Sequence, residues 1–280
     1  MKSRLLAAAI AGFVSVQTEA GTLNEVPSCY AANKIEARPS PPAREIFVLV
    51  DQTTIFDEKL QNSIFENTWG YLAPNSAYTV VSFSAFAQGR YTEVVSAGTI
   101  EPPLSDRDRD ATNQRVLKTF DVCMKSQVAW AKEHAIEAIK KSLAAASTDL
   151  AKSDILAALK DMSARIKESP AKQKVLLMAS DMLENSSVSS FYASNTRMRT
   201  IDPAKELAAA ERANLIGDFG SARVVVIGAG LIGPAGNSKA SYREAPAMNA
   251  LATFWRHYFE KSNAVVAQFG RPALLQPIKQ

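Results

Sequence analysis

Four side chains of this sequence carry oxygen atoms at positions that could bind a metal ion: Asp51, Thr53, Ser153 and Asp181. Asp51 directly follows the apolar run VLV, and Asp181 directly follows the run LLMAS. Carboxylate and hydroxyl oxygens are hard donors, so this set suits Mg²⁺ or another hard divalent cation and does not suit zinc. The sequence therefore predicts a divalent-ion site, provided that the fold brings the four side chains together.

The elements that must position these residues follow from the pattern of apolar residues. The runs before the two aspartates are typical of strands buried on both faces. A helix that begins at Asp57 is expected to direct Leu60, Ile64 and Trp69 to the core. Further strands are predicted near 223–228 and 264–269, a hairpin near 78–87 and 91–97, and helices near 112–146, 153–166, 203–216 and 247–261.

This alternation predicts an α/β fold, a doubly wound and mostly parallel central sheet with helices on both faces and one antiparallel edge strand. Asp51 and Asp181 would then lie at the carboxyl edge of the sheet, where open α/β sheets bind ligands. Thr53 lies two residues after Asp51, and Ser153 begins a helix, so both hydroxyls could join them. The alternative is purely structural, with the aspartates capping loops and Ser153 capping its helix.

The order of these motifs resembles the von Willebrand factor A family. The matching segments are VLVDQTT, SDILAAL, VLLMASDMLENS and VVVIGAG. The resemblance implies a metal-ion-dependent adhesion site in which Thr53 and Ser153 ligate the ion while Asp51 and Asp181 hold it through water. The last serine of the first loop is replaced by Ile55, which leaves a degenerate site with one ligand fewer. The usual glycine after Asp181 is Met182.

Other motifs are weaker. Gly228, Gly230 and Gly233 match a dinucleotide-binding fingerprint, but Pro234 and further loop residues follow where a helix should begin at once, which favours a glycine turn. Two histidines and two cysteines leave almost no material for a zinc site or an iron–sulfur cluster.

The N-terminus predicts export. Lys2 and Arg4 precede an uncharged apolar stretch, and small residues end at Ala20, which is the pattern of a secretory signal peptide. We expect cleavage near Ala20, a periplasmic or extracellular location, and no membrane span afterwards. The domain prediction is a signal peptide at 1–20, an extended segment at 21–43, a von Willebrand factor A-like domain at 44–272 and a tail at 273–280.

The two cysteines, Cys29 and Cys123, form an even set in a chain predicted to be exported. An oxidising compartment favours a disulfide between them. Two buried free thiols are the alternative.

Charge and motifs together restrict the function. The chain has 32 Lys and Arg against 28 Asp and Glu, a net charge of +4, without a long run of like charge, so nucleic-acid binding is not expected. We predict an exported, non-catalytic protein-binding module that docks a partner protein of the cell envelope at the carboxyl edge of its sheet. The alternative is a metal-assisted envelope hydrolase, for which no nucleophile or general base is recognisable.

Overall fold

The computed structural model describes residues 24–37, 39–87, 90–147, 153–194, 197–231 and 245–279. The predicted signal peptide with Ala20, and Gly233 of the glycine motif, lie outside the described residues. Within the described residues, no helix has the length and apolar character needed to cross a membrane.

A six-stranded sheet forms the centre of the molecule, in the order β3-β2-β1-β4-β7-β8. All neighbouring strands are parallel except β2 and β3, which pair antiparallel at one edge. The fold class predicted from sequence is therefore confirmed. The strand bounds are β1 (Arg44–Asp51), β2 (Ser76–Ala87), β3 (Arg90–Ile100), β4 (Gln173–Ala179), β7 (Ala222–Ile227) and β8 (Ala264–Phe269).

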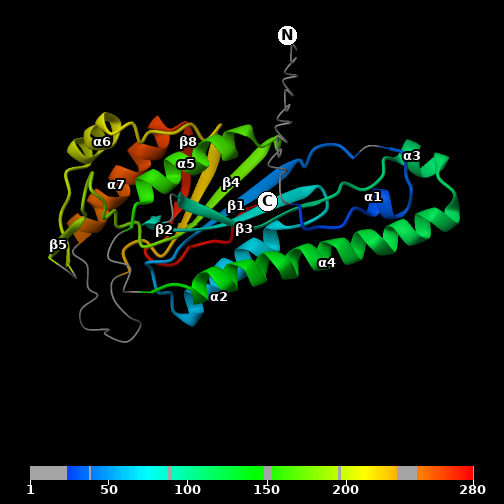
Figure 1. The fold of residues 1–280 in the computed structure, drawn as a ribbon, viewed down its shortest axis with the longest axis horizontal. Coiled ribbons are helices and arrows are strands. Elements are labelled where there is room, and N and C mark those ends of the chain that lie inside the picture. The colour runs from blue at the N-terminus through cyan, green and yellow to red at the C-terminus, as the bar shows by residue number, and fades with distance from the viewer. Residues whose placement is uncertain are drawn as a thin grey trace, which may run out of the picture.

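Helices cover both faces of this sheet (Figure 1). One face packs on α2 (Glu58–Tyr71) and α4 (Gln114–Ala144), and the other packs on α5 (Ile155–Glu168) and α7 (Ala245–Lys261). Successive residues of β1 alternate between the two cores, which explains why its sequence is apolar throughout. Smaller elements are α1 (Cys29–Ala32), α3 (Asp106–Ala111), α6 (Pro203–Arg212), and the ribbon of β5 (Tyr192–Ser194) with β6 (Arg197–Met198).

Trp69 does not point to the core, contrary to the prediction. Its side chain is 45% exposed, and the Lys132 ammonium lies 5.1 Å from the centre of its ring. The buried side of α2 instead carries Leu60, Ile64 and Thr68. Their spacing of four residues follows the helical repeat, so the next residue along the chain turns away from the sheet.

The N-terminal half of α4 extends beyond the sheet, and α1 and α3 lie against it (Figure 1). A separate small core forms there from Cys29, Tyr30, Leu104, Leu117, Phe120 and Met124. Cys29 and Cys123 are joined in a disulfide, as the sequence predicts, with their Cα atoms 5.7 Å apart. The bridge fixes the segment that precedes β1 onto α4.

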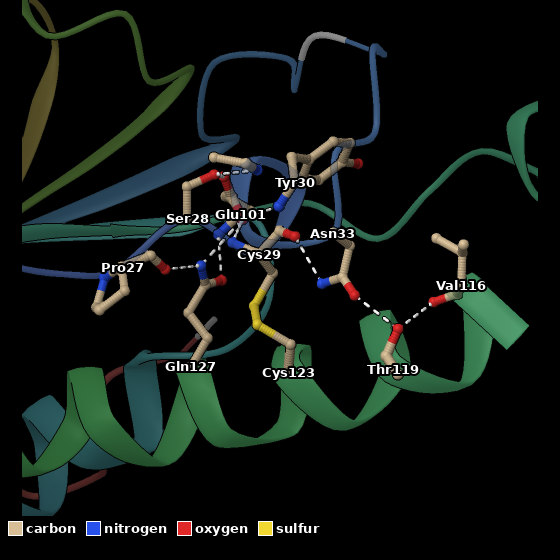
Figure 2. The surroundings of a disulfide bond; sticks show 11 residues. Pro27, Ser28, Cys29, Tyr30, Asn33, Glu101, Val116, Thr119, Cys123 and Gln127 are labelled. Carbon is tan, nitrogen blue, oxygen red and sulfur yellow. Dashed lines mark hydrogen bonds between the residues drawn. A yellow bond between two sulfur atoms is a disulfide. The ribbon is translucent and has the colours of Figure 1, made fainter.

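A buried carboxylate reinforces this attachment (Figure 2). Glu101 accepts hydrogen bonds from the Cys29 amide at 2.7 Å and from the Ser28 hydroxyl at 2.5 Å. Gln127 of α4 completes the set, because its Nε2 donates to Glu101 at 3.0 Å while its Oε1 accepts from the Glu101 amide at 2.9 Å. The segment around Ser28 and Cys29 is therefore held by both covalent and hydrogen bonds.

Near the C-terminus, one residue packs on the domain. Ile278 is buried in the core beneath α2, and its amide donates to the Asn67 side chain at 2.8 Å.

Candidate functional site at the carboxyl edge of the sheet

The carboxyl edge of the sheet gathers the residues singled out from sequence. Asp51 is the last residue of β1, and Asp181 lies two residues beyond the end of β4. Since β1 and β4 are parallel neighbours, both strands end at this edge. Ser153 and Thr53 each reach Asp51 through a hydroxyl group.

Asp51 is the centre of the site and is fully buried. Its Oδ1 accepts hydrogen bonds from the Thr53 amide at 2.9 Å and from the Thr53 hydroxyl at 2.6 Å. Its Oδ2 accepts from the Ser180 hydroxyl at 2.7 Å, and the Ser153 hydroxyl lies 3.3 and 3.4 Å from the two oxygens. Three separate segments of the chain therefore supply donors to one carboxylate.

Burial decides the electrostatics of this carboxylate. Loss of water raises the pKa of Asp51, while the hydrogen bonds from Thr53, Ser180 and Ser153 act in the opposite direction. A hydroxyl donor stabilises a carboxylate less than a cation does, so the charged form is costly in this setting. A divalent ion at the edge would lower that cost.

Asp181 is oriented by its own loop. Its carboxylate accepts from the Leu183 amide at 2.8 Å and from the Tyr192 hydroxyl at 3.2 Å, and its amide donates to the Thr54 hydroxyl at 3.2 Å. The following residue, Met182, has a φ of 61°, a conformation that glycine adopts more easily than methionine. The position that is glycine in the resembled family thus keeps the backbone conformation that glycine would favour.

The Met182 backbone is held in place by the core. Its carbonyl accepts from the Trp255 indole at 2.8 Å, and both side chains are fully buried. Packing against α7 therefore supports the strained backbone at the edge of the sheet.

Ser153 does not cap α5, contrary to that part of the structural alternative, whereas Asp51 and Asp181 each cap their own loop by accepting from the amide two residues on. The N-cap residue is Asp154, whose side chain makes no capping hydrogen bond. Ser153 instead forms an isolated antiparallel bridge with Asn185, with amide-to-carbonyl distances of 3.3 and 3.0 Å. This bridge directs the Ser153 hydroxyl to Asp51.

Glu184 caps α5 from outside the helix. Its Oε2 accepts from the Leu156 amide at 3.0 Å, and its side chain is fully buried. Burial raises the pKa of Glu184 to about 8, although hydrogen bonds from Ser186 and from the Leu156 and Ile155 amides oppose the shift. Its Oε1 makes no hydrogen bond within the described residues.

Sequence reasoning missed four residues of this site, namely Thr54, Ser180, Glu184 and Tyr192. Two of them carried a signal, since Thr54 is adjacent to Thr53 and Ser180 directly precedes Asp181 at the strand end. Glu184 and Tyr192 reach the site through the loop after β4, and no spacing rule points to either.

The donor set is chemically suited to a hard divalent cation, although it is sparse. In the described part of the chain, no three His, Cys, Asp or Glu residues lie close enough together to hold a metal ion. Any ion here would depend on Asp51 and Asp181 together with the hydroxyls of Thr53 and Ser153. Ile55 offers no donor atom, so water or a group from outside the chain would have to complete the shell.

Known proteins show only distant similarity to this chain. No family model and no curated protein matches the chain. Among solved structures it is similar to an aerotolerance-related membrane protein from Bacteroides fragilis, with a TM-score of 0.36 and 11% identity over 81% of this chain and 92% of that chain. It is also similar to SpaC, a pilus adhesin from Lactobacillus rhamnosus GG, with a TM-score of 0.36 and 12% identity over 80% of this chain and 30% of that chain. At these scores the likenesses carry no argument, and the family resemblance rests on the sequence motifs.

Proposed function

We propose that this chain is an exported, non-catalytic protein-binding module of the cell envelope, and that a partner protein docks at the carboxyl edge of its sheet. The observation that supports this proposal most is the buried Asp51 carboxylate, which three hydroxyl-bearing segments converge upon. A buried carboxylate lowers stability, so a fold that keeps one at a ligand-binding edge is a candidate for binding function.

The proposal extends to a weak divalent ion at Asp51, Thr53, Ser153 and Asp181. Bound Mg²⁺ or Mn²⁺ would supply positive charge next to Asp51 and an open coordination position for a carboxylate of the partner. Because Ile55 removes one ligand, affinity for the ion alone should be low.

Thermal melts with and without Mg²⁺ or Mn²⁺ test the ion. If it binds, the folded protein gains about 2.7 kcal/mol when the free ion is at about 100 times its dissociation constant. Asp51→Asn should abolish that gain while keeping the shape of the side chain. A melting temperature that does not respond to either ion would contradict the proposal that an ion binds here. The docking surface would then be tested on its own.

Docking is tested by cross-linking the purified protein to cell-envelope extract and identifying the joined peptides by mass spectrometry. The test variant combines Thr53→Ala, Ser153→Ala and Asp181→Asn. The control combines the same kinds of change away from this edge, as Asp110→Asn and Thr112→Ala at the end of α3 and Ser126→Ala in α4.

Loss of one reproducible cross-linked partner in the test variant alone, with cooperative melting retained, would support docking at the carboxyl edge. If both variants captured the partner equally, the docking surface would have to lie elsewhere on the protein.

A further inference from the structure

A groove of about 980 Å³ opens on the α5 side of the sheet, away from the carboxyl edge. Residues of β1, β2 and β3 form its floor, and one side of α5 forms its wall. Pro42 and Pro170, which stand just before β1 and β4, place it near the amino ends of those strands. It shares none of the four residues proposed to hold an ion.

The topology explains why this face is left open. The strands β2 and β3 are joined by a hairpin, and a hairpin brings no helix across the sheet, unlike a parallel crossover. α5 packs against both β2 and β3, whereas α7 packs against β8 and α6 packs on α7. The sheet surface beyond α5 is therefore covered only in part.

The groove combines an apolar surface with an acidic rim. Its accessible apolar surface comes from Pro42, Val94, Ala164 and Pro170, whereas Phe47 and Met162 line it but are almost fully buried. The described lining residues include four carboxylates and one guanidinium, namely Glu45, Glu93, Asp161, Glu168 and Arg165. The whole chain carries a net charge of +4, whereas the groove is negatively charged.

One of the four carboxylates is already satisfied inside the protein. Glu45 accepts from the Thr79 hydroxyl at 2.9 Å and from the Ser169 hydroxyl at 2.6 Å, and Arg165 lies close enough to affect its charge. Among the three other carboxylates, Asp161 accepts a hydrogen bond from the Thr92 hydroxyl, and none of the three takes part in an ion pair within the described residues. No ion pair there offsets their negative charge, so it can attract a basic ligand.

We infer that this groove receives an extended segment of a partner protein that is rich in lysine and arginine. Such side chains have an apolar stem and a charged tip, so the stems can lie on Val94, Ala164 and Pro170 while the tips reach the rim. Each exposed ion pair alone contributes little, but several pairs made by one segment add up, and salt should weaken them. This surface is distinct from the proposed docking edge, so either can fail without the other.

Fluorescence anisotropy with a labelled lysine-rich peptide tests the inference, with a peptide of the same length carrying acetylated lysines as the uncharged reference. The groove variant combines Glu93→Gln, Asp161→Asn and Glu168→Gln. The control variant combines Asp110→Asn, Glu133→Gln and Glu137→Gln on α3 and α4, which changes the net charge by the same amount.

The groove variant should bind the lysine-rich peptide at least about tenfold more weakly than the unaltered protein, while the control variant stays within about twofold. Ala164→Trp fills the wall of the groove without changing charge and should also weaken binding. Equal weakening by the two charge variants would overturn the inference, because binding would then follow net charge alone. Tight binding of spermine with no binding of the peptide would also overturn it and indicate a small-amine site.

Discussion

Glu184 should give the folded protein a pH-dependent stability of unusual sign for a carboxyl group. Burial raises the pKa of Glu184 from 4.5 to about 8. Between these values the folded state holds a proton that the unfolded state has released, so the free energy of unfolding falls as pH rises. The contribution is fully present below about pH 4.5 and is lost as pH rises through about 8.

At about 1.4 kcal/mol for each pH unit, the interval between the two pKa values corresponds to roughly 5 kcal/mol. That figure is comparable with the whole stability of many domains. The burial of Asp51 and Glu45 also raises their pKa values, so these groups act in the same direction and must be separated from Glu184.

The variant Glu184→Gln separates the contribution of Glu184 from those of Asp51 and Glu45. The amide keeps the shape of the side chain, and its carbonyl oxygen can still accept from the Leu156 amide, but it does not titrate. Urea unfolding of both proteins should show the unaltered protein losing roughly 1.4 kcal/mol per pH unit relative to the variant between about pH 5 and 8. Glu260→Gln, which changes an exposed carboxyl of α7, is the control and should run parallel to the unaltered protein. Parallel curves for Glu184→Gln and the unaltered protein would refute the reasoning.

Two further predictions concern the stability of the framework. The disulfide spans 94 residues of sequence, so its reduction should lower the free energy of unfolding by about 2–4 kcal/mol in urea, and an unchanged midpoint with reductant would contradict this. Gly228 has a φ of 104°, and an added Cβ would lie 2.6 Å from the Phe56 ring, so Gly228→Ala should cost about 2 kcal/mol or more. Thermal melting checks the second change, and a loss below about 0.5 kcal/mol would contradict it.

The strands and the sheet edge were predictable because the signal is local. A strand buried on both faces must be apolar at every position, so VLV and LLMAS identify β1 and β4 and place Asp51 and Asp181 at their ends. The disulfide was predictable from cysteine number and expected export. Both inferences need only short segments of sequence and the rules that govern them.

The missed features depend on contacts between distant segments. Glu184 caps a helix that begins 29 residues earlier, so neither its own segment nor the start of α5 reveals the pairing. Trp69 is a different case, because the helical repeat of Leu60, Ile64 and Thr68 already turns it away from the sheet. The groove beside α5 reflects a face that no crossover covers, and this can be seen only once strand order is known.

The loop after β4 ties together the parts of the site that sequence reasoning treated separately. Within a few residues it supplies Ser180 to Asp51, the Asp181 carboxylate to the edge, and Glu184 to the start of α5. Two carboxyl groups whose charged forms are disfavoured by burial, Asp51 and Glu184, are thus connected through one short segment. Apolar residues of the same size would often stabilise such positions better. The loop therefore fixes the geometry of the edge, which is the property that a docking surface requires.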